Sequence, residues 1–155
     1  MLSKVISGGQ TRADRAALDA GLDAGFPIGG SCPVGRVAED GPLADIYPLT
    51  EIGGGYRQRT KHNVIDADGT VVFYASYVRG GTEATVLFCI RQGRPYKLID
   101  IHLIMPDQAA ALLIDFINDF NVEVLNVAGP GAGNCPEMYT HVKQTMSLFI
   151  RQAIG

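Results

Sequence analysis

Residues 4–25 read KVISGGQTRADRAALDAGLDAG, and this stretch decides the fold class of the chain. The apolar run Lys4 to Ser7 is typical of a short buried strand, and it ends abruptly at Gly8-Gly9. From Arg12 onward, alanines recur on one face at helical spacing, and small side chains let a helix lie close against a sheet. Gly25 then supplies the left-handed position at which helices commonly end. The stretch therefore predicts a strand, a glycine turn and a helix.

The same alternation of strand and helix recurs in the second half of the chain. Strands are expected at 71–75, 96–101 and 122–128, and helices at about 80–92, at 107–118 and from 136 nearly to the C-terminus. The last strand is almost continuously apolar, as is typical of a strand covered on both faces. The pattern predicts an α/β protein with an open, mainly parallel sheet flanked by helices on both faces.

Between these halves the periodicity disappears. Residues 29–55 are rich in Gly and Pro, and we expect a loop-rich excursion across the ligand face with one short helix near Val37. A basic helical segment from Tyr56 to Asn63 follows, and then a turn at Asp66–Gly69. The 155 residues fit one domain better than two, so we expect a single ligand-binding domain spanning 1–155.

Composition and charge limit the classes of partner. The formal charge of -3 argues against a nucleic-acid-binding protein, which uses many Lys and Arg contacts. No stretch reads as a signal peptide or a membrane span. The cysteines at 32, 89 and 135 are odd in number and widely separated, which favours a reduced thiol state and a cytoplasmic location.

Glycine-rich turns after three of the expected strands are the candidate ligand site. The candidate residues are Gly8, Gly9, Gln10, Thr11 and Asp14 in the first turn, Arg79, Gly80, Gly81 and Thr82 in the second, and Gly129, Pro130, Gly131, Gly133 and Asn134 in the third. The carboxyl ends of parallel strands share one edge, where ligands bind in such sheets. Helix starts behind these turns offer unpaired N–H groups to a phosphate. Each turn read alone is equally compatible with a plain strand-to-helix connection, and Asp14 with a helix-capping role.

Several cations can reach the same edge, and we expect one or two to pair with phosphate. The cations that can reach this edge are Arg12, Arg15, Arg36, Arg57, Arg59, Lys61 and Arg79. No catalytic residue can be assigned, because no nucleophile–base order or carboxylate pair stands out. The histidines show no metal-ligand spacing with one another or with a cysteine, so no metal site is expected. Cys32 and Cys135 fall in loops on the ligand side of the sheet. Each thiol is either inert or in contact with a soft metal ion.

A series of motifs runs through most of the chain. They are SGGQTxxDRAALD at 7–19, CPxGRxAEDG at 32–41, YPLxE at 47–51, YRxRTxxNV at 56–64, DxDGT at 66–70, GGT at 80–82 and NVAGP at 126–130. These motifs resemble the putative molybdenum carrier family, which belongs to a wider Rossmann-like superfamily of nucleotide-ligand binders that includes phosphoribohydrolases. The resemblance implies a cytoplasmic, often oligomeric binder of the molybdenum cofactor, a phosphorylated pterin that carries its metal on dithiolene sulfurs. Family members tend to carry an Arg after the Gly-Pro of the last turn, where this chain has Gly131.

The favoured function is therefore a carrier or sensor of a phosphorylated pterin or nucleotide-like ligand, without nucleic-acid or membrane partners. The alternative is a phosphoribohydrolase-like enzyme, but aligning its Gly-Gly-x-Gly-Thr-x-x-Glu loop on Gly80-Gly81 places Leu87 where the catalytic Glu belongs. The resemblance also implies a homo-oligomer. An apolar stripe on the last helix, including Met146 and Ile150, suits either core packing or a subunit interface.

Overall fold

A five-stranded sheet forms the centre of the computed structural model, which describes residues 1–38, 40–131 and 135–155. The strand order is β2-β1-β9-β7-β8, and all neighbouring pairs are parallel. The strands are β1 (Lys4–Ile6), β2 (Ile28–Gly29), β7 (Gly69–Tyr74), β8 (Tyr96–Asp100) and β9 (Val124–Ala128). The predicted open parallel sheet is confirmed.

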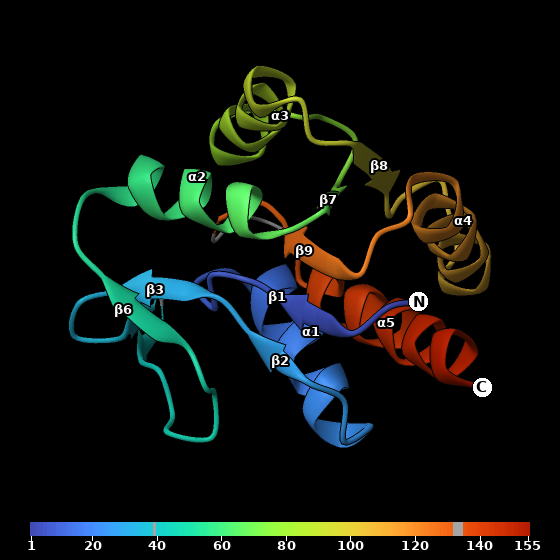
Figure 1. The fold of residues 1–155 in the computed structure, drawn as a ribbon, viewed down its shortest axis with the longest axis horizontal. Coiled ribbons are helices and arrows are strands. Elements are labelled where there is room, and N and C mark those ends of the chain that lie inside the picture. The colour runs from blue at the N-terminus through green and yellow to red at the C-terminus, as the bar shows by residue number, and fades with distance from the viewer. Residues whose placement is uncertain (39, 132–134) are drawn as a thin grey trace.

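Helices cover both faces of this sheet (Figure 1). One face carries α2 (Tyr56–Asp66) and α3 (Gly81–Gln92), which pack against each other. The other face carries α1 (Arg12–Asp23), α4 (Pro106–Phe120) and α5 (Glu137–Ile154), with α5 in contact with both of its neighbours. This arrangement confirms the two-sided covering expected from the sequence. None of the helices in the described ranges combines the length and apolar character needed to cross a bilayer.

The apolar stripe of α5 belongs to the core. Val142, Met146, Phe149 and Ile150 are all fully buried in the packed cluster beneath the sheet. Of the two alternatives left open by the sequence, core packing accounts for the stripe without a second subunit.

The excursion between β2 and α2 contains short strands in place of the predicted helix. They are β3 (Ser31–Pro33) and β6 (Thr50–Ile52), which pair in parallel, and β4 (Val37–Ala38) and β5 (Gly41–Pro42), which pair antiparallel. The helix expected near Val37 is wrong, because Val37 lies in a tight antiparallel pair that follows the left-handed Arg36 (φ 56°). The Arg36 guanidinium donates to the carbonyl oxygens of Ala44 at 2.7 Å and Tyr47 at 2.8 Å, which ties the excursion together.

The chain connections diverge at the centre of the sheet. From β1 the chain runs through α1 to β2 at one edge, whereas from β7 it runs through α3 to β8 at the other edge. Because α1 and α3 lie on opposite faces, a crevice is expected at the carboxyl ends of β1, β9 and β7 (Figure 1). Ligands of open parallel sheets bind at this kind of divergence point.

Candidate functional site

The three glycine turns meet at one edge of the sheet. They follow β1, β7 and β9, and β9 lies between the other two strands with parallel pairing on both sides. The geometry on which the sequence prediction depends is therefore present. The binding roles of the individual residues stay a prediction.

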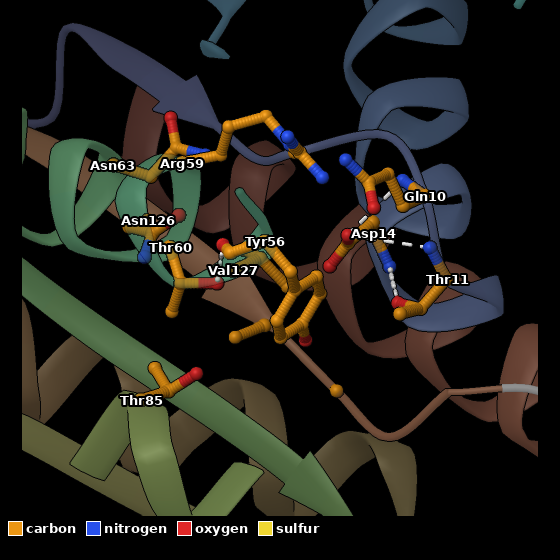
Figure 2. Close-up of a pocket in the computed structure, with 13 residues that line it drawn as sticks. Gln10, Thr11, Asp14, Tyr56, Arg59, Thr60, Asn63, Thr85, Asn126 and Val127 are labelled. Atoms are coloured by element: carbon orange, nitrogen blue, oxygen red, sulfur yellow. Dashed lines mark hydrogen bonds between the residues drawn. The ribbon is translucent and has the colours of Figure 1, made fainter. Parts of the chain in front are cut away.

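The first turn is closed by its own side chains. The amide of Gly9 donates to Ser7 Oγ at 3.2 Å, and the amides of Gln10 and Thr11 donate to Asp14 Oδ2 at 3.2 and 3.3 Å. The Asp14 amide in turn donates to Thr11 Oγ1 at 3.1 Å, which completes a capping box at the start of α1 (Figure 2). Three amides that the sequence offers to an anion are thus bonded within the turn.

The second turn is built differently. Its last residue before α3, Gly80, has the positive φ of 61° that glycine tolerates, and as the N-cap residue it makes no side-chain capping bond. We call this helix start uncapped with respect to the described residues. Thr82 Oγ1 donates to the carbonyl of Arg79 at 2.7 Å and accepts from its amide at 3.1 Å, so this hydroxyl braces the turn and does not cap an amide of α3. Glu83, in the first turn of α3, is exposed. The start of α3 is therefore the better anion position.

The third turn packs directly on α1. A Cβ added at Gly129 would stand 2.3 Å from Ala13 Cβ, so only glycine lets β9 and α1 approach this closely. Pro130 and Gly131 follow at the surface of a cavity. Gly133 and Asn134, also candidate residues, lie outside the described residues.

Two cavities of ligand size flank the start of α1, and Arg12 lines both. The edge cavity, as we call the first, has a volume of about 420 Å³ and is bordered by Arg79 and Thr82 of the second turn and Pro130 and Gly131 of the third. The second cavity, of about 530 Å³, lies on the other side of the helix start. Both fall within the range of small-molecule sites.

The space directly above β9, between α1 and α2, is much smaller. It holds about 40 Å³, enough for a few water molecules and too little for a nucleotide. Figure 2 shows the Tyr56 ring in this space and the Arg59 guanidinium directed from α2 toward Gln10 and Asp14. A Cβ on Gly81 would stand 2.6 Å from the Tyr56 hydroxyl, so this side chain reaches across to the start of α3. We name this space the central pocket.

Of the seven candidate cations, Arg57 and Lys61 are exposed on α2, and the other five have distinct positions. Arg12 and Arg79 line the edge cavity, and Arg59 lines the central pocket, where its Nε is buried without a partner among the described residues. Arg36 holds loop carbonyls instead, and Arg15 pairs with the Asp40 carboxylate at 3.0 Å. Tyr56 was not predicted from the sequence as a site residue, although it belongs to the YRxRT motif.

Part of the wall of the second cavity is formed by two tyrosines that share one carboxylate. The hydroxyls of Tyr47 and Tyr139 donate to the two carboxylate oxygens of Asp19. Burial, followed by this hydrogen bond, raises the pKa of Tyr47 to about 12 and raises that of Tyr139 as well. Burial also raises the pKa of Cys32, which fits the inert role expected for its thiol.

A parallel sheet with helices on both faces, and with cavities at the carboxyl edge where its connections diverge, defines a Rossmann-like α/β protein. The chain belongs to the circularly permutated YpsA SLOG family, whose family model matches residues 5–150. It is also similar to the crystal structure of a "Putative molybdenum carrier protein" from Syntrophus aciditrophicus SB, with 39% sequence identity and a TM-score of 0.91. That match covers 96% of this chain and 95% of the other. A search of the curated proteins found no match. The family resemblance expected from the motifs is confirmed.

Proposed function

We propose that this protein is a non-catalytic carrier or sensor that binds a phosphorylated, nucleotide-like molecule in the edge cavity. The observation that carries the proposal is the uncapped start of α3 beside Arg79 and Arg12 on a cavity of about 420 Å³. The helix start contributes N–H donors and partial positive charge, and the guanidinium groups contribute full charges, so the donor set matches a phosphate group.

The molybdenum cofactor is the cargo that we propose first. The similar protein from Syntrophus aciditrophicus is named a molybdenum carrier, and the motifs of this chain imply the same class of ligand. The phosphate of such a pterin fits between Arg79, Thr82 and Arg12, and the volume of the edge cavity suits a ligand of this size. Other phosphorylated nucleotide-like molecules share that phosphate chemistry and are the alternative cargo.

No specific observation among the described residues favours the enzymatic alternative. Leu87 stands where the glutamate of a phosphoribohydrolase loop belongs, and it lies in the middle of α3 rather than at the turn. We also propose a single ligand-binding domain on the length of the chain, a cytoplasmic location on its cysteines and the family resemblance, and a homo-oligomeric state on the family resemblance alone. Light scattering of the purified protein measures the last of these directly.

A thermal-shift screen tests the proposed binding. The probes are pterin phosphates, nucleoside mono- and diphosphates, inorganic pyrophosphate and molybdate, added to the full chain. A ligand at a hundredfold excess over its Kd stabilises the folded state by about 2.7 kcal/mol, which raises Tm by about 5–10 °C in a protein of this size. We expect such a shift with at least one phosphorylated probe.

Two matched variants locate the binding. Arg79→Ala removes the cation beside the start of α3, and Arg91→Ala removes an exposed cation from the last turn of the same helix. The ligand-induced shift should fall strongly in Arg79→Ala and persist in Arg91→Ala. An absent shift with every probe, or equal shifts in both variants, would contradict the proposal.

A further inference from the structure

Three side chains with metal-ligand chemistry meet at the wall of the edge cavity. His102 follows β8, while Cys135 and Glu137 flank the start of α5. One ligand atom from each residue lies within 4.8 Å of the other two, and His102 Nε2 is 3.0 Å from Glu137 Oε1. The sequence showed no such site, because the fold brings His102 to residues more than thirty positions away.

The spacing of these atoms suits a small divalent ion. Zinc binds sulfur at about 2.3 Å and nitrogen or oxygen at about 2.0–2.2 Å, so its tetrahedral ligands stand about 3.3–3.6 Å apart. The three atoms therefore need shifts of about 1 Å at most to close on an ion. His102 and Glu137 are about half exposed, so their side chains have room to make this adjustment.

Hydrogen bonds with Ser76 and Asp100 fix the orientation of His102. Its Nδ1 lies 2.8 Å from Ser76 Oγ, and the carboxylate of Asp100 accepts the amides of Ser76 at 3.1 Å and of His102 at 3.0 Å. Ser76 adopts a φ of 70°, a left-handed conformation that costs a non-glycine residue free energy. When Nδ1–H donates to Ser76, Nε2 presents its lone pair toward Glu137 and Cys135. Histidine ligands of metals are oriented by this kind of outer hydrogen bond.

We propose that His102, Cys135 and Glu137 form a binding site for a divalent transition-metal ion of the zinc class. Three protein ligands leave a fourth coordination position, which opens into the edge cavity beside Arg79. The site rests on this cluster alone and does not depend on the proposed phosphate binding.

The charges of the cluster favour uptake of a cation. Glu137 supplies a carboxylate and Cys135 a thiol, and both types of group bind divalent ions in their deprotonated forms. Because a metal-bound cysteine is a thiolate, metal binding at Cys135 should release a proton.

The chain of Ser76, His102 and Glu137 also has the order of a hydrolase triad, but two observations favour the metal. The amide of Tyr77, next to Ser76, is bonded to the Ala75 carbonyl at 2.9 Å and is not available to an oxyanion. The Cys135 thiol also lies within 4.8 Å of the ligand atoms of His102 and Glu137, and a hydrolase triad would not require this third group.

Titration of the chelator-treated full chain with Co²⁺ tests the site directly. Wild-type protein should bind one equivalent, with thiolate-to-cobalt charge-transfer absorption and release of a proton. Zn²⁺ should displace the cobalt and abolish the absorption. Absence of this absorption in wild-type protein would overturn the proposal without any variant.

Variants assign the ligands. Cys135→Ser should lose the charge-transfer absorption, and His102→Ala should lower the affinity at least tenfold. Ser76→Ala, which frees the positioned ring, should weaken binding about 10–100-fold while the absorption spectrum is kept. Wild-type affinity and absorption in Cys135→Ser would overturn the assignment.

His62→Ala is the matched control. His62 pairs with Asp66 at 2.9 Å and both side chains are half exposed, as in the His102–Glu137 pair, but no thiol is grouped with it among the described residues. This variant should bind cobalt like wild type, and loss of binding would overturn the assignment. Thermal unfolding of each variant without metal verifies that it is folded. Phosphate-ligand binding is measured without metal, so failure of either proposal leaves the other intact.

Discussion

The first and second glycine turns look alike in sequence but use their amides in opposite ways. Both place a Gly-Gly pair and a Thr before or within the start of a helix. In the first, Asp14 folds back onto the amides of Gln10 and Thr11, whereas in the second, Glu83 occupies the same third helical position and is exposed. A glycine pair therefore marks the turn, and the residue three positions into the helix decides whether the amides are available to a ligand.

The largest expected effect concerns the third turn, which packs on α1 just after the closed first turn. Gly129→Ala would press a methyl group against Ala13 Cβ, so we expect a loss of about 3 kcal/mol in the free energy of unfolding. Gly55→Ala, with open space around its Cβ and a negative φ of -83°, is the control and should change little. Urea denaturation measures both, and equal losses would show that the close approach is not needed.

Asp14→Ala tests the closed turn itself. The variant removes the acceptor of two backbone donors, the buried amide of Thr11 and the half-buried amide of Gln10, so we expect a loss of about 2 kcal/mol. Glu83→Ala, at the matching position of α3, should cost about 0.5 kcal/mol or less because this side chain is exposed. Similar losses in the two variants would remove the distinction between the turns.

The two threonines separate stability from binding. Thr11→Val and Thr82→Val each lose a hydroxyl that bonds the backbone, and each should cost about 1 kcal/mol. Only Thr82→Val should also weaken a phosphorylated ligand, by about tenfold, because the Thr82 hydroxyl holds the backbone of Arg79. Calorimetric titration distinguishes them, and an affinity loss in Thr11→Val alone would reverse the assignment.

The smallest effect is a pH dependence on the α1 side. Because the fold raises the pKa of Tyr47 from 10.0 to about 12, the stabilisation from its neutral hydroxyl is complete below pH 10 and is lost as the pH rises through about 12. Tyr47→Phe should flatten the fall in unfolding free energy across this window and cost about 1 kcal/mol at neutral pH. An unchanged alkaline slope, measured by urea denaturation at several pH values, would contradict this.

Periodicity was enough to predict the regular elements of the fold. The alanine spacing after Arg12 and the left-handed Gly25 correctly bounded α1, and the apolar run before Gly129 correctly indicated β9. The strand β2 was missed because Ile28 and Gly29, between a proline and another glycine, are too few to show a period. The helix predicted near Val37 was wrong because the Arg36 guanidinium bonds to the carbonyls of Ala44 and Tyr47 and because Val37 lies in a two-residue antiparallel pairing.

The candidate site was predictable only to the level of the sheet edge. Parallel pairing alone brings the three turns together, and this could be inferred from the strand–helix alternation. Whether Asp14 served a ligand or its own helix depends on side-chain geometry, and both alternatives fitted the sequence. The meeting of His102 with Cys135 depends on tertiary packing between the ends of β8 and α5, which no local spacing encodes.

The most direct test of the account is the backbone amide spectrum of the protein, recorded by NMR during titration with a ligand found in the thermal-shift screen. Phosphate binding at the uncapped helix start should shift the amide resonances of Gly81 and Thr82, while those of Gln10 and Thr11, bonded to Asp14, should stay in place. Large shifts confined to Gln10 and Thr11, with Gly81 and Thr82 unchanged, would contradict it.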